Sequence, residues 1–191
     1  MEHAFLDVIN TEANRMARIV TDLLTLSRLD YDKNALNKSS FSLPKLTRDV
    51  VRKLSIDAKR HNLTLTATGS EEMPPFYGDR DRLEQVITNI ISNAVKYTPD
   101  GGEVTVDCEF KYTHAVLTVR DTGIGIPKED LPRIFERFYR VDKARSRKQG
   151  GTGLGLAIAK EIIEAHGGEI KIESQQRRGT VVTITLPVYS A

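Results

Sequence analysis

The segment from Asp79 to Lys96 is the strongest constraint on the fold, because one predicted helix there carries an apolar face and a polar stripe side by side. At about 100° per residue, the apolar face consists of Leu83, Val86, Ile87, Ile90, Ile91 and Ala94. The polar stripe, spaced i, i+4, i+8 and i+11, consists of Gln85, Asn89, Asn93 and Lys96. The apolar face predicts a helix that packs against a core.

The polar stripe has two interpretations, and the helix alone does not separate them. One is a solvated flank that happens to include two asparagines. The other is a binding edge, because asparagine is a mediocre helix former and lysine or glutamate would serve a solvated flank better. Amide oxygens can hold a hydrated Mg²⁺ that also binds nucleotide phosphates, and a lysine can face an anion.

The rest of the chain predicts an α+β fold. Strand patterns occur at 63–66, 103–110, 115–121, 169–174 and 180–186, and helix patterns at 42–61, 128–138 and 154–166. Ser42 is the expected N-cap of the first of these helices, with Pro44 just inside it. Strands connected both by hairpins and through helices predict a two-layer sandwich, with a mixed sheet of about five strands and helices on one face.

A long amphipathic helix is predicted before this unit. Its apolar seam consists of Phe5, Ile9, Ala13, Met16, Val20, Leu23, Leu24 and Leu26. The seam predicts that the helix folds back on the rest of the chain or pairs with a missing partner, such as another subunit. We therefore divide the chain into residues 1–30, a linker at 31–40 and a main domain at 41–191, and we expect a longer parent protein, because the chain starts in mid-helix.

Composition excludes several classes. The 191 residues are 39% hydrophobic and 28% charged, with a net charge of +2, which is typical of a globular domain and argues neither for nor against nucleic acid. The lone cysteine, Cys108, cannot form an internal disulfide, which fits a reducing compartment. No stretch reaches the roughly 20 apolar residues of a membrane span, and no signal peptide is present.

A carboxylate followed by glycines ends one predicted strand, at Asp121-Thr122-Gly123-Ile124-Gly125. Glycines permit close backbone approach, so the segment suits a flat heterocycle with an amino group. Adenine can donate its N6 amine to Asp121, whereas guanine would present a carbonyl there, at a cost of about 1–3 kcal/mol. The alternative is a simple Asp-Gly turn.

A second glycine-rich segment, residues 150–156, opens the last predicted helix, and a helix N-terminus favours an anion. Upstream of it lies a basic run that includes Arg140, Lys143, Arg145, Arg147 and Lys148. No preceding strand exists and Ile158 stands where a dinucleotide-binding fingerprint requires glycine or alanine, so that reading fails. Aromatic residues are not interleaved with the basic run, so we expect a solvated or phosphate-facing loop and no direct nucleic-acid partner.

Taken in order, these segments resemble the catalytic domain of sensor histidine kinases, in the GHKL group that also includes DNA gyrase, heat-shock chaperone and mismatch-repair ATPases. Residues 85–97 resemble the N box, 121–125 the G1 box, 135–140 the F box and 151–156 the G2 box, with Gly179-Thr180 as a final small motif. The F box distinguishes the chain from the gyrase and chaperone branches.

The resemblance implies a role for each matching residue. It implies Asn89 and Asn93 as Mg²⁺ ligands, Lys96 and Arg140 at phosphates, Tyr97 near the sugar or base, and a mobile lid from about Val141 to Gly153. Catalysis is then expected to depend on Asn93, Lys96 and Arg140. The implied nucleotide-binding set is Asn89, Asn93, Lys96, Tyr97, Asp121, Gly123, Gly125, Ile126, Arg140, Gly151, Thr152, Gly153, Leu154, Gly155 and Thr180.

The resemblance also implies what lies outside this chain. The first 30 residues resemble the second helix of a dimerisation and phosphotransfer hairpin, whose acceptor histidine lies on the absent first helix; none of His3, His61, His114 and His166 fits that role. The implied partners are ATP, that hairpin and a response regulator. The parent protein is expected to be a membrane-anchored homodimer with this part in the cytoplasm and monomeric on its own. Two alternatives are a nucleotide-binding regulatory module without transferase activity, and a gyrase-like ATPase using Glu84.

Overall fold

The computed structural model describes residues 2–31, 36–70, 72–141 and 151–188. The helices are α1 (Glu2–Tyr31), α2 (Leu43–Arg60), α3 (Arg80–Tyr97), the short 3₁₀ helix η1 (Leu131–Arg133) and α5 (Gly155–Ala165). The strands are β1 (Ser39–Phe41), β2 (Thr64–Gly69), β3 (Phe76–Gly78), β4 (Glu103–Lys111), β5 (His114–Asp121), β6 (Glu169–Gln175) and β7 (Gly179–Pro187). None of the described helices is both long and apolar enough to span a bilayer.

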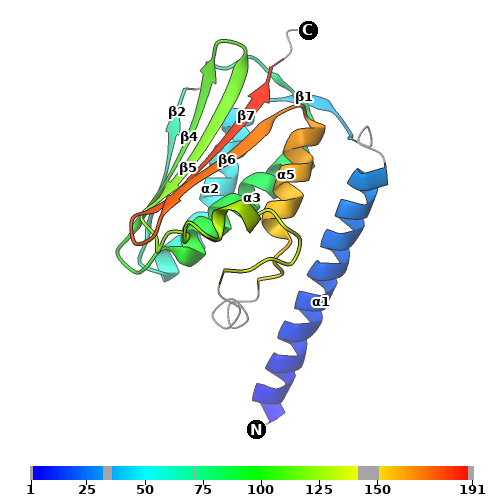
Figure 1. The fold of residues 1–191 in the computed structure, drawn as a ribbon, viewed down its shortest axis with the longest axis vertical. Coiled ribbons are helices and arrows are strands. Elements are labelled where there is room, and N and C mark those ends of the chain that lie inside the picture. The colour runs from blue at the N-terminus through cyan, green and yellow to red at the C-terminus, as the bar shows by residue number, and fades with distance from the viewer. Residues whose placement is uncertain (1, 32–35, 71, 142–150, 189–191) are drawn as a thin grey trace.

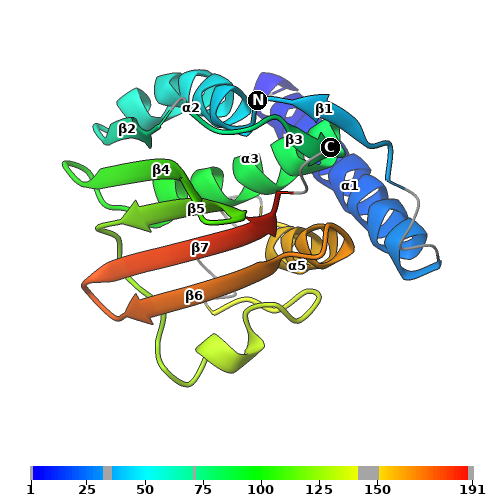
Figure 2. The ribbon, with the colours of Figure 1, turned by 90° about the horizontal axis from the view of Figure 1, so that it is seen from above.

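Five strands form one mixed sheet in the order β2-β4-β5-β7-β6. The β2–β4 pair is parallel and the other three pairs are antiparallel. Helices α2, α3 and α5 cover one face of this sheet, and α1 lies on the side of those helices away from the sheet (Figures 1 and 2). The predicted α+β sandwich, with five strands and helices on one face, is confirmed.

The core lies between the sheet and its helices. Val104 and Val106 of β4 alternate inward and are fully buried, as period-two patterning predicts. Val86 and Ile91 of α3 and Ile158 of α5 meet them from the other layer. Burying side chains of this size contributes about 1.5–3 kcal/mol each, so this contact fixes where α3 lies over the sheet.

Helix boundaries follow their caps. Ser42 caps α2, because its side-chain oxygen accepts the Lys45 N–H at 3.3 Å, and Pro44 lies in the first turn, as expected. Asp79 caps α3 by accepting the Arg82 N–H at 3.1 Å. Asp79 also accepts the backbone N–H of Asn37 at 2.9 Å, which ties the segment after α1 to the start of α3.

Two features differ from the prediction. The expected helix at 128–138 is only a 3₁₀ turn, because Pro132 lacks an N–H and the backbone bonds there run from residue i+3 to residue i, as from Arg133 to Asp130 at 2.9 Å. A two-stranded ribbon of β1 and β3 was not predicted. Its strands are three residues each and their pairing joins segments far apart in the chain, so local periodicity carries no signal for it.

Helix α1 folds back on the main domain only at its C-terminal end. Its last turns fold back, with Leu26 and Leu29 buried against the main domain. The earlier part projects away from the rest (Figure 1). Several large apolar side chains are exposed there: Leu6, Ile9, Met16, Val20, Leu23 and Leu24.

Candidate functional site

Helix α3 holds the polar stripe at a half-buried edge. Its apolar face is anchored in the core, so Asn89, Asn93 and Lys96 all lie at the border between core and solvent. The Asn89 side-chain Nδ2 donates to the carbonyl of Gly155, the first residue of α5, at 3.3 Å. The other atom of the amide, Asn89 Oδ1, is therefore free to accept a hydrogen bond or to bind a cation.

Asp121 ends strand β5 and is nearly buried, with 9% of its surface exposed. Its Oδ1 atom accepts two backbone N–H groups, from Gly123 at 2.8 Å and from Thr180 at 3.1 Å. Within the described chain no hydrogen bond goes to Oδ2, so that oxygen can accept from a ligand. Burial raises the pKa of this carboxyl group, and the two N–H donors oppose that rise.

The loop after Asp121 needs glycine at two positions for steric reasons. A Cβ on Gly123 would lie 2.6 Å from the Tyr97 carbonyl oxygen and 2.7 Å from Asp121 Oδ1. Gly125 has φ +67°, and a Cβ there would lie 2.1 Å from the Gln175 carbonyl oxygen. The loop therefore runs close to both α3 and the β6–β7 turn, which brings the predicted G1 segment next to Tyr97.

Sequence reasoning missed Ser174, a strand residue that holds this loop in place. Its hydroxyl accepts the Ile126 N–H at 2.8 Å, donates to the Gly179 carbonyl at 2.9 Å and lies 2.9 Å from the Thr180 hydroxyl. Ser174 thus links Ile126 to Thr180, two predicted site residues. A serine in an alternating strand carries no distinguishing signal, so only the three-dimensional structure reveals this contact.

Positively charged side chains act at the C-terminal end of the polar stripe, around Lys96. The pKa of the Lys96 ammonium is lowered, first by burial and then by the like charges of Arg140 and Arg18. Arg140 also donates to the carbonyl of Gly151. A half-buried lysine beside two guanidinium groups suits an anion, because a bound negative charge relieves their mutual repulsion.

The G2 segment begins α5 with a tight turn. Gly153 has φ +75°, and a Cβ on it would lie 3.0 Å from the Phe138 backbone. The Phe138 N–H donates to the Gly153 carbonyl at 2.9 Å, which joins the F-box segment to the G2 segment. The Thr152 hydroxyl accepts the N–H of the buried Leu154 at 3.2 Å and so orders the helix start.

The predicted lid falls mostly outside the described residues. Of Val141–Gly153, residues 142–150 are not described, and the basic side chains of Lys143, Arg145, Arg147 and Lys148 lie among them. The described end of this stretch, Gly151 to Gly153, is hydrogen-bonded to Arg140 and to the backbone of Phe138.

Helix α1 contacts the G2 segment, and the sequence did not indicate this contact. Asp22 accepts the Thr152 hydroxyl at 3.3 Å, and Arg82 donates to the Thr25 hydroxyl at 3.1 Å. Burial raises the pKa of Asp22, while the Thr152 hydrogen bond and the nearby Arg18 oppose the rise. On sequence alone, an Arg and an Asp four residues apart are typical of a solvated helix surface.

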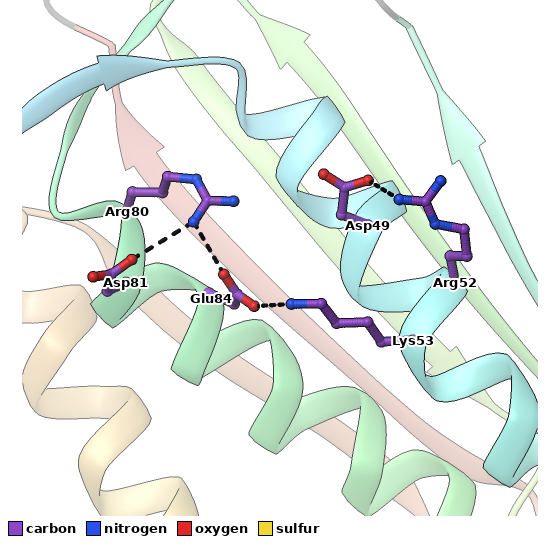
Figure 3. Close-up of polar contacts among 6 residues, drawn as sticks. All are labelled: Asp49, Arg52, Lys53, Arg80, Asp81 and Glu84. Atoms are coloured by element: carbon purple, nitrogen blue, oxygen red, sulfur yellow. Dashed lines mark hydrogen bonds and ion pairs between the residues drawn. The ribbon is translucent and has the colours of Figure 1, made fainter.

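Glu84, the candidate water-activating residue of a gyrase-like ATPase, points elsewhere. It accepts from Lys53 of α2 at 2.5 Å and from Arg80 at 3.2 Å, on the flank of α3 that faces α2 (Figure 3). Figure 3 also shows the pair of Asp49 and Arg52, at 2.9 Å, which lies within α2. Through its ion pairs with Lys53 and Arg80, Glu84 joins α2 to α3 instead.

Three hydrogen bonds join pairs of the predicted site residues or their immediate neighbours. Asn89 contacts Gly155, Tyr97 accepts the Ile124 N–H at 3.1 Å, and Asp121 bonds to Thr180 across two paired strands. Two cavities, of about 600 and 430 Å³, lie beside α1, and none of the predicted nucleotide-binding residues lines either of them. Within the described residues, no cluster of three or more His, Cys, Asp or Glu side chains could hold a metal, so a cation would depend on the amides and on its ligand.

Residues 78–190 match the family model described as histidine kinase-, DNA gyrase B- and HSP90-like ATPase. The chain belongs to this family, and its fold is that of the ATP-binding catalytic domain of a sensor histidine kinase. It is similar to the sensor histidine kinase WalK of Bacillus subtilis, with 43% identity over 96% of this chain. It spans only 30% of that relative's length.

Two solved structures are also similar. Full-length ShkA in complex with AMPPNP superposes with a TM-score of 0.85 at 26% identity, over 99% of this chain and 39% of that one. The histidine kinase ThkA in complex with the response regulator protein TrrA gives a TM-score of 0.75 at 27% identity, over 97% and 51%. Both matches include α1, so the fold extends beyond the residues that the family model covers.

Proposed function

We propose that this chain binds ATP as its magnesium complex and that, in the whole protein, it transfers the γ-phosphoryl group to a histidine carried on another segment. The observation that carries the proposal is the state of Asp121. One carboxylate oxygen is saturated by the Gly123 and Thr180 N–H groups, and the other has no hydrogen bond within the described chain. An adenine N6 amine matches that oxygen, while the guanine O6 carbonyl would repel it.

The amides and cations fit the remainder of such a nucleotide. The Nδ2 atom of Asn89 is bonded to Gly155, which leaves its Oδ1 atom for a ligand. Asn93 follows one turn later on the same edge of α3. Two neutral oxygens suit Mg²⁺, which keeps several waters and shares phosphate ligands; the ion would neutralise phosphate charge. Lys96 and Arg140 supply fixed positive charge beside it, and Tyr97 lies between the stripe and the adenine end.

The proposed reaction needs no covalent intermediate on this domain. A neutral imidazole nitrogen of the acceptor attacks the γ-phosphorus, the bond from that phosphorus to the β–γ bridging oxygen breaks, and ADP leaves with the electron pair. The imidazole N–H proton remains on the ring or passes to water. This domain contributes positioning and charge neutralisation, which account for most of the catalysis in phosphoryl transfer.

The acceptor, the response regulator and the membrane location are proposed for the whole protein. The exposed apolar seam of α1, including Met16 and Val20, suits pairing with the other helix of a hairpin and with a second subunit. ThkA is seen with a response regulator protein, and an equivalent partner is proposed for the parent of this chain. The parent is proposed to be anchored in the cell membrane with this domain in the cytoplasm.

Nucleotide titration tests the binding half of the proposal. Wild type should bind Mg-ATP with at least tenfold preference over Mg-GTP, and omission of Mg²⁺ should weaken ATP binding. Asp121→Asn keeps an Oδ1 acceptor for the Gly123 and Thr180 N–H groups but puts an NH₂ group against the adenine amine. It should lose about 10- to 100-fold in ATP affinity, about 1.4–2.8 kcal/mol. Equal binding of ATP and GTP by wild type would sink the proposal.

A second titration tests the magnesium ligands. Asn93→Ala should remove most of the magnesium dependence while leaving metal-free ATP binding nearly unchanged, because the adenine contact at Asp121 is intact. Ser92→Ala is the matched control, since among the described residues its hydroxyl bonds only to the Asn89 carbonyl, at 3.2 Å on the same helix. An Asn93→Ala protein with an unchanged magnesium response would contradict the assignment.

The alternative function is a nucleotide-binding regulatory module without transferase activity. The observation that would favour it is the absence of an acceptor histidine from this chain. A separately supplied hairpin carrying the acceptor decides between the two. With Mg-ATP, the transferase should produce acid-labile phosphohistidine on that hairpin, and Asn93→Ala should abolish it; a regulatory module would bind ATP and produce none.

A further inference from the structure

Helix α1 is fixed against the nucleotide-binding domain at several points in its C-terminal part, between Asp22 and Asp30. Thr25 accepts from Arg82, Leu26 and Leu29 are buried, and Asp30 accepts twice from Arg137, at 2.8 and 2.9 Å. One turn before Thr25, Asp22 accepts from Thr152. These contacts set the rotation of α1 about its axis, and therefore which of its side chains face the G2 segment.

Arg18 lies on the face of α1 that is directed towards this segment. It precedes Asp22 by four residues, which places it one turn further along the same face. Both residues border the 430 Å³ cavity, whose described lining comes from α1. Asp22 contacts Thr152, and Arg140 contacts the adjacent Gly151, so two arginines approach the same short segment from two elements.

The charges around Lys96 support this placement. Burial lowers the pKa of the Lys96 ammonium most, and the positive charges of Arg140 and Arg18 lower it further. Three cations, from α1, α3 and the end of the F-box segment, therefore act on the same region. Arg18 is exposed and can extend its side chain towards a ligand without loss of packing.

We infer that Arg18 of α1 contacts the terminal phosphate of the bound nucleotide, so that α1 supplies part of the phosphate site. The inference rests on the proposed function and names a further positioning residue for it. Adenine at the buried Asp121 lies at the sheet layer, and α1 lies on the far side of the helices (Figure 1). A nucleotide extended from Asp121 past Lys96 therefore presents its last phosphate to α1.

The test compares Mg-ATP with Mg-ADP on the whole chain by titration calorimetry. Arg18→Ala should weaken ATP binding about fivefold to tenfold and ADP binding less than twofold, because ADP lacks the terminal phosphate; tenfold corresponds to about 1.4 kcal/mol. Arg18→Lys keeps the charge and should recover at least half of the lost ATP affinity in free-energy terms. Salt should weaken ATP binding more in wild type than in Arg18→Ala.

Arg28→Ala is the matched charge control, since it removes the same charge from the same helix about 15 Å further along. It should leave both nucleotide affinities unchanged. Equal losses of ATP and ADP affinity in Arg18→Ala, or no loss of either, would overturn the inference. Failure of wild type to prefer ATP over GTP would instead count against the proposed function, so the two can fail separately.

Discussion

Arg137 of the F-box segment holds Asp30 at the end of α1, with its Nη2 atom 2.8 and 2.9 Å from the two carboxylate oxygens. The two residues lie 107 positions apart in the chain. This ion pair joins the N-terminal helix to the nucleotide-binding domain beside the buried Leu29.

The Arg137–Asp30 pair should contribute modestly to the docking of α1. Both side chains are about half exposed, at 43% and 47%, so a double-mutant cycle of Arg137→Ala and Asp30→Ala should give a coupling of about 0.5–1 kcal/mol. Amide hydrogen exchange in α1 near Leu26 should accelerate in either variant. Arg133→Ala is the control, because Arg133 pairs with Glu136 three residues away and leaves α1 untouched. Unchanged exchange in Arg137→Ala would contradict the docking role.

Gly179→Ala should destabilise the protein by about 3 kcal/mol or more. Gly179 has φ +101°, and a Cβ there would lie 2.0 Å from the Asp121 carbonyl oxygen. The added methyl group must therefore disturb the pairing of Asp121 with Thr180. Gly101→Ala is the control: φ is +80° there, but no atom lies within 4 Å, so only the backbone term of about 1–2 kcal/mol remains. Equal losses in chemical denaturation would refute the steric explanation.

Acid should destabilise the fold through His166. Its Nδ1 donates to the Ile162 carbonyl at 2.7 Å and its Nε2 accepts the Asp79 N–H at 3.0 Å, so the buried ring is neutral. Burial lowers its pKa, while the Ile162 carbonyl and the Asp79 carboxylate oppose that fall and Lys38 adds to it. Because the folded pKa lies below the ordinary 6.5, stability is complete above pH 6.5 and declines as the pH falls towards the folded pKa.

Denaturation of wild type between pH 7.5 and 5 measures this effect, with a limiting slope of about 1.4 kcal/mol per pH unit for one proton. His166→Gln should be less stable at neutral pH but should show a smaller slope. The exposed His61 provides the control substitution, His61→Gln, which should keep the wild-type slope. An identical slope in wild type and His166→Gln would exclude His166 as the titrating group.

Asp121→Asn should stabilise the nucleotide-free protein at neutral pH while it weakens ATP binding. Burial raises the pKa of the Asp121 carboxyl group in the folded state. The stability associated with its protonated form is therefore present at low pH and is lost as the pH rises through the folded pKa. An amide carries no charge, so the variant should gain in melting temperature at pH 7 and gain nothing at pH 3. A loss of stability at pH 7 would show that the carboxylate is structural.

Glu84→Gln should affect stability and leave nucleotide chemistry unchanged. It weakens the contacts with Lys53 and Arg80 that join α2 to α3 (Figure 3), at a cost of about 0.5–1 kcal/mol. Asp49→Asn, whose pair with Arg52 lies within α2, is the control and should cost less. A rapid ATPase activity in wild type that Glu84→Gln abolishes would instead favour the gyrase-like mechanism.

The sequence predicted the elements that depend on local periodicity. The apolar face of α3, the five strands of the sheet and the cap at Ser42 all follow from residue type and spacing, because adjacent residues fix which face is buried. It also identified Asp121 and its glycines, since a carboxylate at a strand end followed by Gly123 and Gly125 is a local pattern.

The tertiary structure alone decided how these pieces meet. The bond from the Thr180 N–H to Asp121 spans 59 positions, and Asp22 reaches Thr152 across 130. Such contacts depend on strand pairing and on how α1 docks, and residue spacing carries no information about either. The apolar pattern at 128–138 predicted a helix that is longer than the 3₁₀ turn in the structure. The hydrogen bonds around Pro132 join residues three apart, and an apolar pattern carries no information about this backbone geometry. The sequence thus determined which residues are candidates for binding, and long-range packing determined which of them lie in contact with one another.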